Sequence, residues 1–101
     1  MMTVVTTTRL RPGGEAEWDA AMRERFDSAH GRPGWVSGQL LTPQDEQHTR
    51  TVVGTWRSRD DWQAWHSDPA FLEQRETLER LEAEPSRAQW FDVVADARAD
   101  G

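Results

Sequence analysis

The first apolar run of the chain alternates with the period of a β-strand. From Thr3 to Arg11, every second residue falls on one face, which carries Val4, Thr6, Thr8 and Leu10. Pro12, Gly13 and Gly14 end this strand. From Glu15 the period becomes helical, and the predicted helix extends to His30 and Gly31. Its apolar side is expected to carry Trp18, Ala21, Met22, Phe26 and Ala29, with Glu and Arg on the opposite side.

Two further strands follow a turn at residues 32–34. The pattern predicts strands over residues 35–42 and 48–56, joined by a polar loop that begins at Pro43. Their proximity along the chain indicates a β-hairpin.

Two short helices and a last strand complete the pattern. Ser58 and Asp61 form a capping box, so a helix is expected over residues 59–66. Asp68 and Pro69 begin a second helix, which Pro85 ends. Four apolar residues of this helix are expected to face inward: Phe71, Leu72, Leu78 and Leu81. A strand is expected over residues 88–95, followed by a polar tail from about residue 96.

This order, β-α-β-β-α-β with the second helix broken, predicts an α+β fold of ferredoxin-like topology. We expect one domain over residues 1–101, with an antiparallel sheet and both helices on one of its faces. The other face is also expected to be apolar, with Val52, Trp56 and either Trp35 or Trp90 on it. An apolar sheet face requires a cover, and a two-fold homodimer that packs sheet on sheet is the simplest one.

Composition limits the possible functions. The chain has no Cys, which excludes disulfides and thiolate chemistry. Its net charge is -6, and all basic residues are Arg, so we expect no nucleic-acid partner. Neither a signal peptide nor a membrane span is recognisable, so no membrane association and a cytoplasmic location are expected. With six Trp and an acidic surface, a small aromatic or apolar ligand is favoured over a polyanion.

Two segments resemble the antibiotic-biosynthesis-monooxygenase family. One is Pro33-Gly34-Trp35, and the other runs from Trp56-Arg57-Ser58 through Trp62 and Trp65 to Phe71. The resemblance extends from Val4 to about Val94. It implies a dimeric α/β barrel with one pocket in each subunit, between the sheet and the broken second helix.

The resemblance also implies a site and a chemistry. Some family members oxidise anthrones or related aromatic hydroquinones with oxygen and without a cofactor, and this is our first hypothesis. Candidate substrate-binding residues are Trp56, Trp62, Trp65, Thr8, Val52 and Arg75. Val52 occupies the position of a recurring Asn, and this chain contains no Asn. Possible substitutes are Thr8, Gln39, His48 and Arg50, and no catalytic residue is assigned.

Haem binding or degradation is a further alternative, because haem-degrading relatives have a Trp at the position of Trp65. Their axial His corresponds to Arg75 here and their Asn to Thr8, although His66 directly follows Trp65. This alternative therefore ranks below cofactor-free oxygenation.

A non-catalytic dimer that binds a small molecule is the other alternative. Trp56, Trp62 and Trp65 could equally fill the pocket as line it. Trp18 is expected in the core because of its helical phase. The three His residues lack the spacing of metal ligands, so no metal site is predicted.

Overall fold

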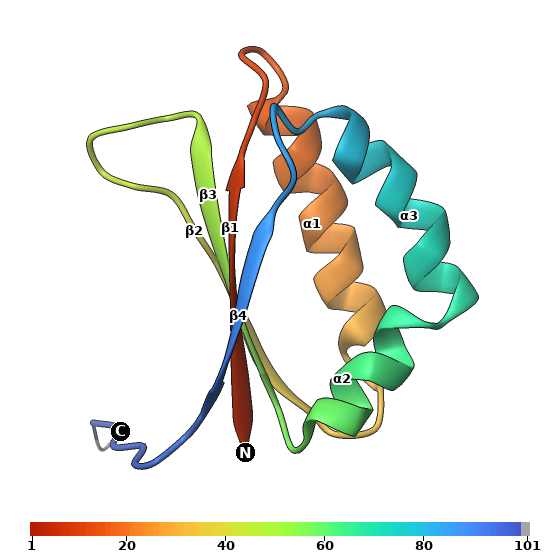
Figure 1. Cartoon of the computed structure of the whole chain (residues 1–101), viewed down its shortest axis with the longest axis vertical. Helices are drawn as coiled ribbons and strands as arrows, with labels where there is room; N and C mark the ends of the chain where they lie inside the picture. Colours follow the sequence, from red (N-terminus) through yellow and green to blue (C-terminus); the bar gives the residue numbers. More distant parts are fainter. Residues whose placement is uncertain (100–101) are drawn as a thin grey trace.

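The computed structural model describes residues 1–99, which form a four-stranded sheet and three helices (Figure 1). In chain order these are β1 (Met2–Arg9), α1 (Glu15–Ala29), β2 (Trp35–Leu41), β3 (Thr49–Trp56), α2 (Arg59–His66), α3 (Pro69–Arg80) and β4 (Arg87–Asp92). The strands lie in the order β2-β3-β1-β4, and every neighbouring pair is antiparallel. The predicted α+β, ferredoxin-like topology with its broken second helix is confirmed.

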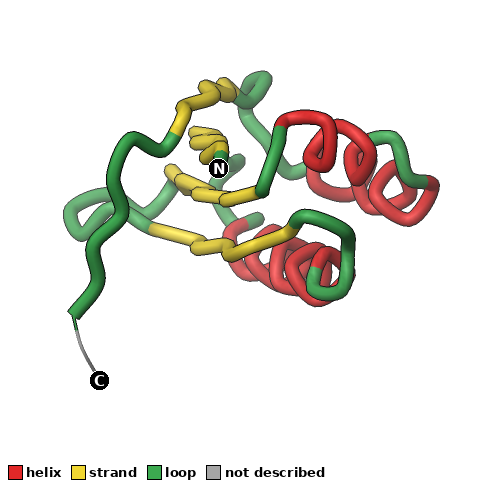
Figure 2. The backbone as a smooth tube through the Cα atoms, turned by 90° about the horizontal axis from the view of Figure 1, so that it is seen from below, coloured by secondary structure: helices red, strands yellow, loops and turns green. Residues whose placement is uncertain are grey.

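The three helices lie on one side of the sheet, and the C-terminal segment runs away from the sheet on the other side (Figures 1 and 2). The core between the sheet and the helices consists of two separate apolar clusters. One contains Met2, Val4, Ala29, Trp56, Trp65 and Phe71. The other contains Leu10, Trp18, Met22, Leu78 and Leu81. Trp18 is a core residue, as its helical phase predicts.

Side-chain caps fix the ends of the two short helices. The hydroxyl of Ser58 accepts a hydrogen bond from the Asp61 backbone N–H (3.2 Å) and donates one to the Asp61 carboxylate (3.0 Å). The Asp68 carboxylate accepts the N–H of Ala70 (2.9 Å). Both predicted starts are therefore confirmed. Helix α3 ends earlier than expected, at Arg80, because the next residues bond back to the end of β1 through the pairing of Leu10 with Glu82.

Two expectations about orientation are wrong. Leu72 is 47% exposed rather than inward, because it is one position beyond the buried Phe71 and therefore about 100° around the helix. Val52, Trp56, Trp35 and Trp90 do not lie on the open face of the sheet. Val4 is buried beneath the helices and pairs with Gly54 and Trp90, so the alternation places this whole set on the helix side.

The remaining side chains of each strand point to the open face of the sheet. Its central rows are Thr3, Val5, Thr7, Thr51, Val53 and Thr55, with Leu41 and Phe91 at the sides. This face is therefore a mixture of Thr and apolar side chains without an aromatic cluster. No helix within residues 1–99 is long and apolar enough to cross a membrane.

Candidate functional site

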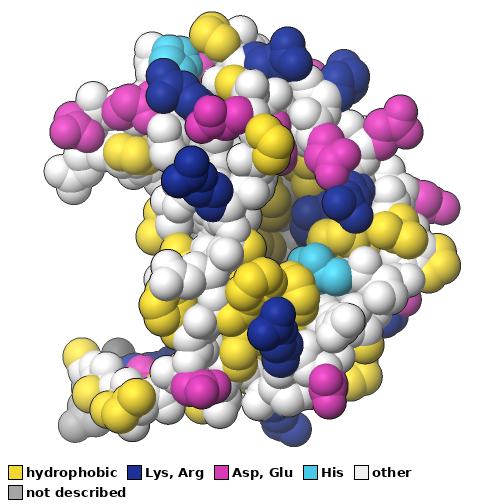
Figure 3. Space-filling view, viewed as in Figure 1, with side chains coloured by type: hydrophobic (Ala, Val, Ile, Leu, Met, Phe, Trp, Pro, Cys, Tyr) yellow, Lys and Arg dark blue, Asp and Glu magenta, His cyan; other side chains and the backbone are white. Residues whose placement is uncertain are grey.

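A cavity of about 320 Å³ lies between the sheet and the helices. Its walls include Val4, Trp56 and Phe71 of one core cluster, and Trp18, Met22 and Leu78 of the other. The cavity therefore divides the core into its two parts. Figure 3 shows a hollow between the sheet and the helices, bordered by hydrophobic and basic side chains and by a histidine. Its volume lies at the lower end of the ~300–1,000 Å³ range of small-molecule sites.

All six residues predicted from the sequence for a binding site line this cavity. They come from four elements and comprise Thr8, Val52, Trp56, Trp62, Trp65 and Arg75. The sheet contributes three of them because Thr8, Val52 and Trp56 share the helix-facing side of β1 and β3. The structure thus brings together residues that are up to 67 positions apart in the sequence, from Thr8 to Arg75.

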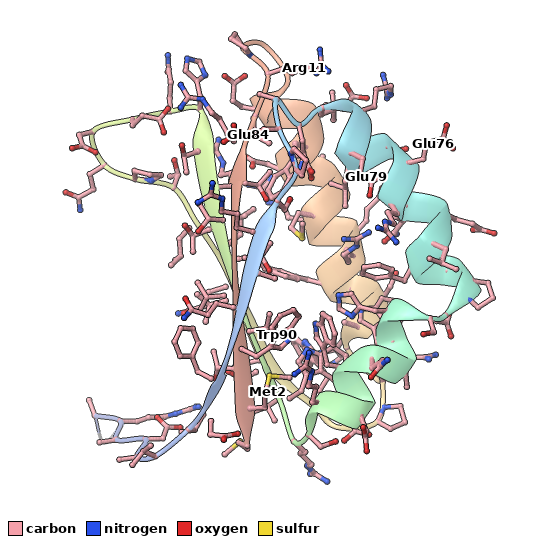
Figure 4. All side chains as sticks on the ribbon, in the orientation of Figure 1. Met2, Arg11, Glu76, Glu79, Glu84 and Trp90 are labelled. Carbon is pink, nitrogen blue, oxygen red and sulfur yellow. The ribbon has the colours of Figure 1, made fainter. Side chains whose placement is uncertain are left out.

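Aromatic rings form the end of the cavity near α2. Trp56 and Trp65 are buried, and the Trp65 ring meets Phe71 edge to face at a centroid distance of 5.7 Å. Trp62 contacts Trp90 in the same manner at 5.4 Å. Figure 4 shows Trp90 next to Met2, on the part of the sheet close to α2. Such edge-to-face packing holds the rings in place, so the cavity presents a rigid aromatic wall.

Arg25 lies within the apolar stripe of α1, where sequence reasoning did not place it. Trp18, Met22 and Ala29 are buried, and Arg25 follows Met22 by three positions, so it shares their side of the helix. Its guanidinium carbon is 3.8 Å from the centroid of the Phe71 ring, and Nη2 donates a long hydrogen bond to the Phe71 carbonyl (3.5 Å). Burial lowers the pKa of Arg25 to about 10, which still leaves the group charged at neutral pH.

His66 is a second cavity residue that was not assigned to the site from the sequence. Its Nδ1 lies 2.8 Å from the Trp62 carbonyl, and since a carbonyl oxygen only accepts, Nδ1 carries the hydrogen. The ring packs against Trp62 (4.0 Å) and Phe71 (4.2 Å). Burial lowers the pKa of His66 to about 4, so the imidazole is neutral at pH 7 and its Nε2 is an acceptor.

A chain of hydrogen bonds forms the opposite end of the cavity. Ser86 donates to one oxygen of Glu82 (3.1 Å), and the Trp18 indole N–H donates to the other (3.3 Å). Because the single hydroxyl hydrogen of Ser86 is used in this way, the hydroxyl of Thr8, 2.8 Å away, must donate to Ser86. Thr8 can therefore accept a hydrogen bond from a ligand but has no hydrogen left to donate.

The other suggested substitutes for the missing Asn do not line the cavity. Arg50 is buried at the end of the sheet, where it forms a two-pronged ion pair with Asp19 (2.9 and 3.1 Å). Nδ1 of His48 lies 2.7 Å from the Glu15 carboxylate. Gln39 pairs with Val53 and lies on the open face of the sheet. These residues stabilise the junction between α1 and the hairpin or face away from the helices.

The pKa of His66 predicts an acid-sensitive stability. Because the folded-state pKa is about 4 and the ordinary value is 6.5, the unfolded chain binds a proton in this window and the folded protein does not. Stability is therefore lost as the pH falls from 6.5 towards 4. We expect a loss of about 1 kcal/mol between pH 7 and about pH 5, which is less than the full linkage value of about 2 kcal/mol because the ring is partly solvated.

Urea unfolding at the two pH values measures this effect. His66→Phe keeps the aromatic packing and removes the titration, so its stability should change less than that of the parent over the same window. An equal change in both proteins would show that other groups cause the acid sensitivity.

The residues that the resemblance would assign to a haem group are absent from their positions. Arg75, at the position of the axial ligand in haem-degrading relatives, forms an ion pair with Glu79 (2.7 Å), and Thr8 replaces their Asn. Within residues 1–99, no group of three or more His, Asp or Glu side chains is arranged to hold a metal ion.

Comparison with known proteins identifies the family. The model of the antibiotic biosynthesis monooxygenase family matches residues 1–77, so the chain belongs to this family. No curated protein matches the sequence.

Solved structures show the same fold at low sequence identity. A candidate antibiotic biosynthesis monooxygenase from Nitrosomonas europaea superposes with a TM-score of 0.88 at 17% identity, covering 94% of this chain and 100% of that one. SnoaB, a cofactor-independent oxygenase from Streptomyces nogalater, gives 0.85 at 21% identity, covering 94% of both chains. Rv0793 from Mycobacterium tuberculosis gives 0.85 at 18% identity, covering 96% and 98%.

Proposed function

We propose that this protein is a cofactor-independent monooxygenase that oxidises a flat aromatic or quinol-type molecule in the cavity between the sheet and the helices. The observation that carries the proposal is the cavity itself, an aromatic-walled chamber with a few inward polar groups. Membership of the monooxygenase family and the fold shared with the cofactor-independent oxygenase SnoaB support the class of reaction.

The reaction needs little from the protein beyond binding and electrostatics. In an anthrone, the methylene between the aromatic rings takes up one atom of O₂ as a carbonyl, and its two hydrogens leave with the other atom as water. In a 1,4-quinol, a ring carbon beside a hydroxyl takes up one atom of O₂, which gives a hydroxyquinone, and two hydrogens leave with the other atom as water. The electrons come from the electron-rich anion of the substrate, so a dry site that stabilises this anion is sufficient. Trp56 and Trp65 would stack against the substrate, and Trp62 and Val52 would complete the apolar wall.

Oxygen uptake tests this proposal. We would measure it with 1,8-dihydroxyanthrone and 1,4-dihydroxynaphthalene and subtract the rate with heat-denatured protein. We expect saturable, protein-dependent uptake with at least one of them. Trp56→Phe and Trp65→Phe should each lower kcat/KM about tenfold, which corresponds to the loss of about 1.4 kcal/mol of stacking.

Trp90→Phe is the matched control, because Trp90 contacts Trp62 but does not line the cavity. Its rate should equal that of the parent. If the two cavity variants also turned over substrate at the parent rate, the role assigned to Trp56 and Trp65 would be wrong.

Non-catalytic binding is a second candidate function. It is favoured by the hydrogen bond that Thr8 donates to Ser86, which leaves few side chains able to donate to a developing oxyanion. This function predicts saturable quenching of Trp fluorescence by the same two compounds without oxygen uptake. Steady uptake during binding would exclude it.

The family resemblance and the open face of the sheet support a homodimer. Leu41 and Phe91 are exposed on this face, and Val94, on the segment beyond β4, is 97% exposed. A second copy packed on the face would cover these apolar groups and the threonine rows between them.

Sedimentation equilibrium at micromolar concentration should give twice the chain mass of 11.6 kDa. Phe91→Glu should favour the monomer, whereas Leu72→Glu, on the exposed side of α3, should not. A parent mass of 11.6 kDa would contradict the dimer.

A further inference from the structure

Arg25 is a positively charged residue of the cavity wall. Among residues 1–99, no carboxylate lies within ion-pair distance of its guanidinium, and its buried Nε has no hydrogen-bond partner. An arginine has five N–H donors, and here a single long bond to the Phe71 carbonyl uses one of them. A partly dehydrated cation with free donors is stabilised by an incoming anion.

The acidic residues nearest to Arg25 already have other partners. Glu79 is paired with Arg75 (2.7 Å), and both oxygens of Glu82 accept hydrogen bonds from Ser86 and Trp18. These carboxylates act on Arg25 only at a distance. Within residues 1–99, Arg75 is therefore the cavity cation in a direct ion pair, whereas the Arg25 guanidinium has free donors and interacts with Glu79 and Glu82 only through space.

His66 requires a hydrogen-bond donor from a ligand, whereas Arg25 requires an acceptor. Its Nδ1 hydrogen is committed to the Trp62 carbonyl, so the remaining ring nitrogen, Nε2, can only accept a hydrogen bond while the ring is neutral. The imidazole and the Arg25 guanidinium pack against the same ring, that of Phe71, at 4.2 and 3.8 Å from its centre. Both residues also line the cavity, so a ligand inside it can contact both.

We propose that Arg25 and His66 select the monoanion of a dihydroxylated aromatic: Arg25 binds the ionised oxygen, and Nε2 of His66 accepts a hydrogen bond from the hydroxyl that keeps its proton. A carboxylate could satisfy Arg25 but could not donate to His66, and a neutral diether offers neither a negative charge to Arg25 nor a hydrogen to His66. The inference deepens the proposed function, on which it rests, because such a monoanion is the electron-rich form that reacts with oxygen. It makes Arg25 the polar group that binds the anion in a chain that contains no Asn.

Nitrohydroquinone is a suitable probe because its phenolate is coloured and its two oxygens lie on opposite sides of one ring. Binding is followed anaerobically by Trp quenching, and ionisation by the phenolate absorbance of the saturated complex. We expect the parent protein to lower the pKa of the bound probe by about one unit, a tenfold increase in the ratio of phenolate to phenol. Arg25→Met should abolish this shift.

Arg80→Met is the matched control. It makes the same substitution on the neighbouring helix α3, but Arg80 pairs with Glu17 (3.3 Å) and does not line the cavity. It should retain the shift. No saturable quenching by the probe, an unchanged shift in Arg25→Met, or an equal loss in Arg80→Met would each overturn the proposal.

The role of His66 is tested with 4-methoxy-2-nitrophenol, in which a methyl group replaces the second hydroxyl hydrogen. The parent should bind this ether about tenfold more weakly than nitrohydroquinone, which corresponds to one hydrogen bond of about 1.4 kcal/mol. His66→Phe keeps the ring and should bind both probes equally, with the pKa shift retained. Persistence of the parent's preference in this variant would exclude the role of His66.

These results separate the two proposals. Anion binding without oxygen uptake would contradict the oxygenase and leave the binding of the monoanion intact. Oxygen uptake by Arg25→Met at the parent kcat/KM would leave the oxygenase intact and overturn the role of Arg25.

Discussion

Replacing Trp18 with alanine is expected to lower the free energy of unfolding by about 4 kcal/mol, within the ~3–5 kcal/mol range of such truncations in protein cores. Trp18 is 1% exposed and packs with Leu10, Met22 and Leu78, and its indole N–H is bonded to Glu82. The space left behind would merge with the existing cavity, so the neighbouring side chains could not easily close it. For a domain of this size the melting temperature should fall by roughly 20 °C.

Urea and thermal unfolding at a fixed protein concentration measure the effect. Trp90→Ala provides the comparison, because it removes the same side chain at a position that is 37% exposed. We expect a loss of about 2 kcal/mol there, as its ring is covered mainly by Trp62 and Arg59 and remains partly exposed. Equal losses in the two variants would show that Trp18 does not hold the second core cluster together.

Much of the fold could be predicted from the pattern along the chain. The change from period two to helical spacing at Glu15, and the caps at Ser58 and Asp68, give the starts of α1, α2 and α3. The last strand was expected over residues 88–95 and ends earlier, at Asp92. Alternation alone could not decide which half of each strand meets the helices, because Val and Thr occur on both faces of β1 and β3. This is why Val52 and Trp56 were expected on the wrong side of the sheet.

The family resemblance predicted the aromatic residues of the site. Its polar residues Arg25 and His66 were identified only in the structure. Arg25 was grouped with the solvent-facing charges of α1, although its spacing from Trp18, Met22 and Ala29 places it in their stripe. That spacing was a signal in the sequence. His66 gave no such signal, since its bond to the Trp62 carbonyl and its packing against Phe71 depend on how α2 and α3 are arranged.

Gly34→Ala is expected to destabilise the protein by about 3 kcal/mol, because two costs add at this position. Gly34 has a φ of +82°, which an alanine adopts only with strain. A Cβ there would also lie 2.6 Å from the Cβ of Asp61 and closer still to its carboxylate. Asp61 would have to move, and its reciprocal bonds with Ser58 at the start of α2 would break. The Pro-Gly-Trp motif is thus explained by close contact between this turn and the helix that carries Trp62, Trp65 and His66.

Substitutions at Gly13 and Gly31 separate the cost of the backbone strain from that of the steric clash. Gly13 also has a positive φ, +89°, but a Cβ there meets nothing within 4 Å, so Gly13→Ala should cost only the backbone strain, about 1 kcal/mol. Gly31 has neither constraint, and Gly31→Ala should be close to neutral. Because the displacement of Asp61 loosens α2, Gly34→Ala should also weaken the binding of nitrohydroquinone, whereas Gly13→Ala should not. If both variants lost equal stability and bound the probe equally well, the contact between Gly34 and Asp61 would not be what positions α2 over the cavity.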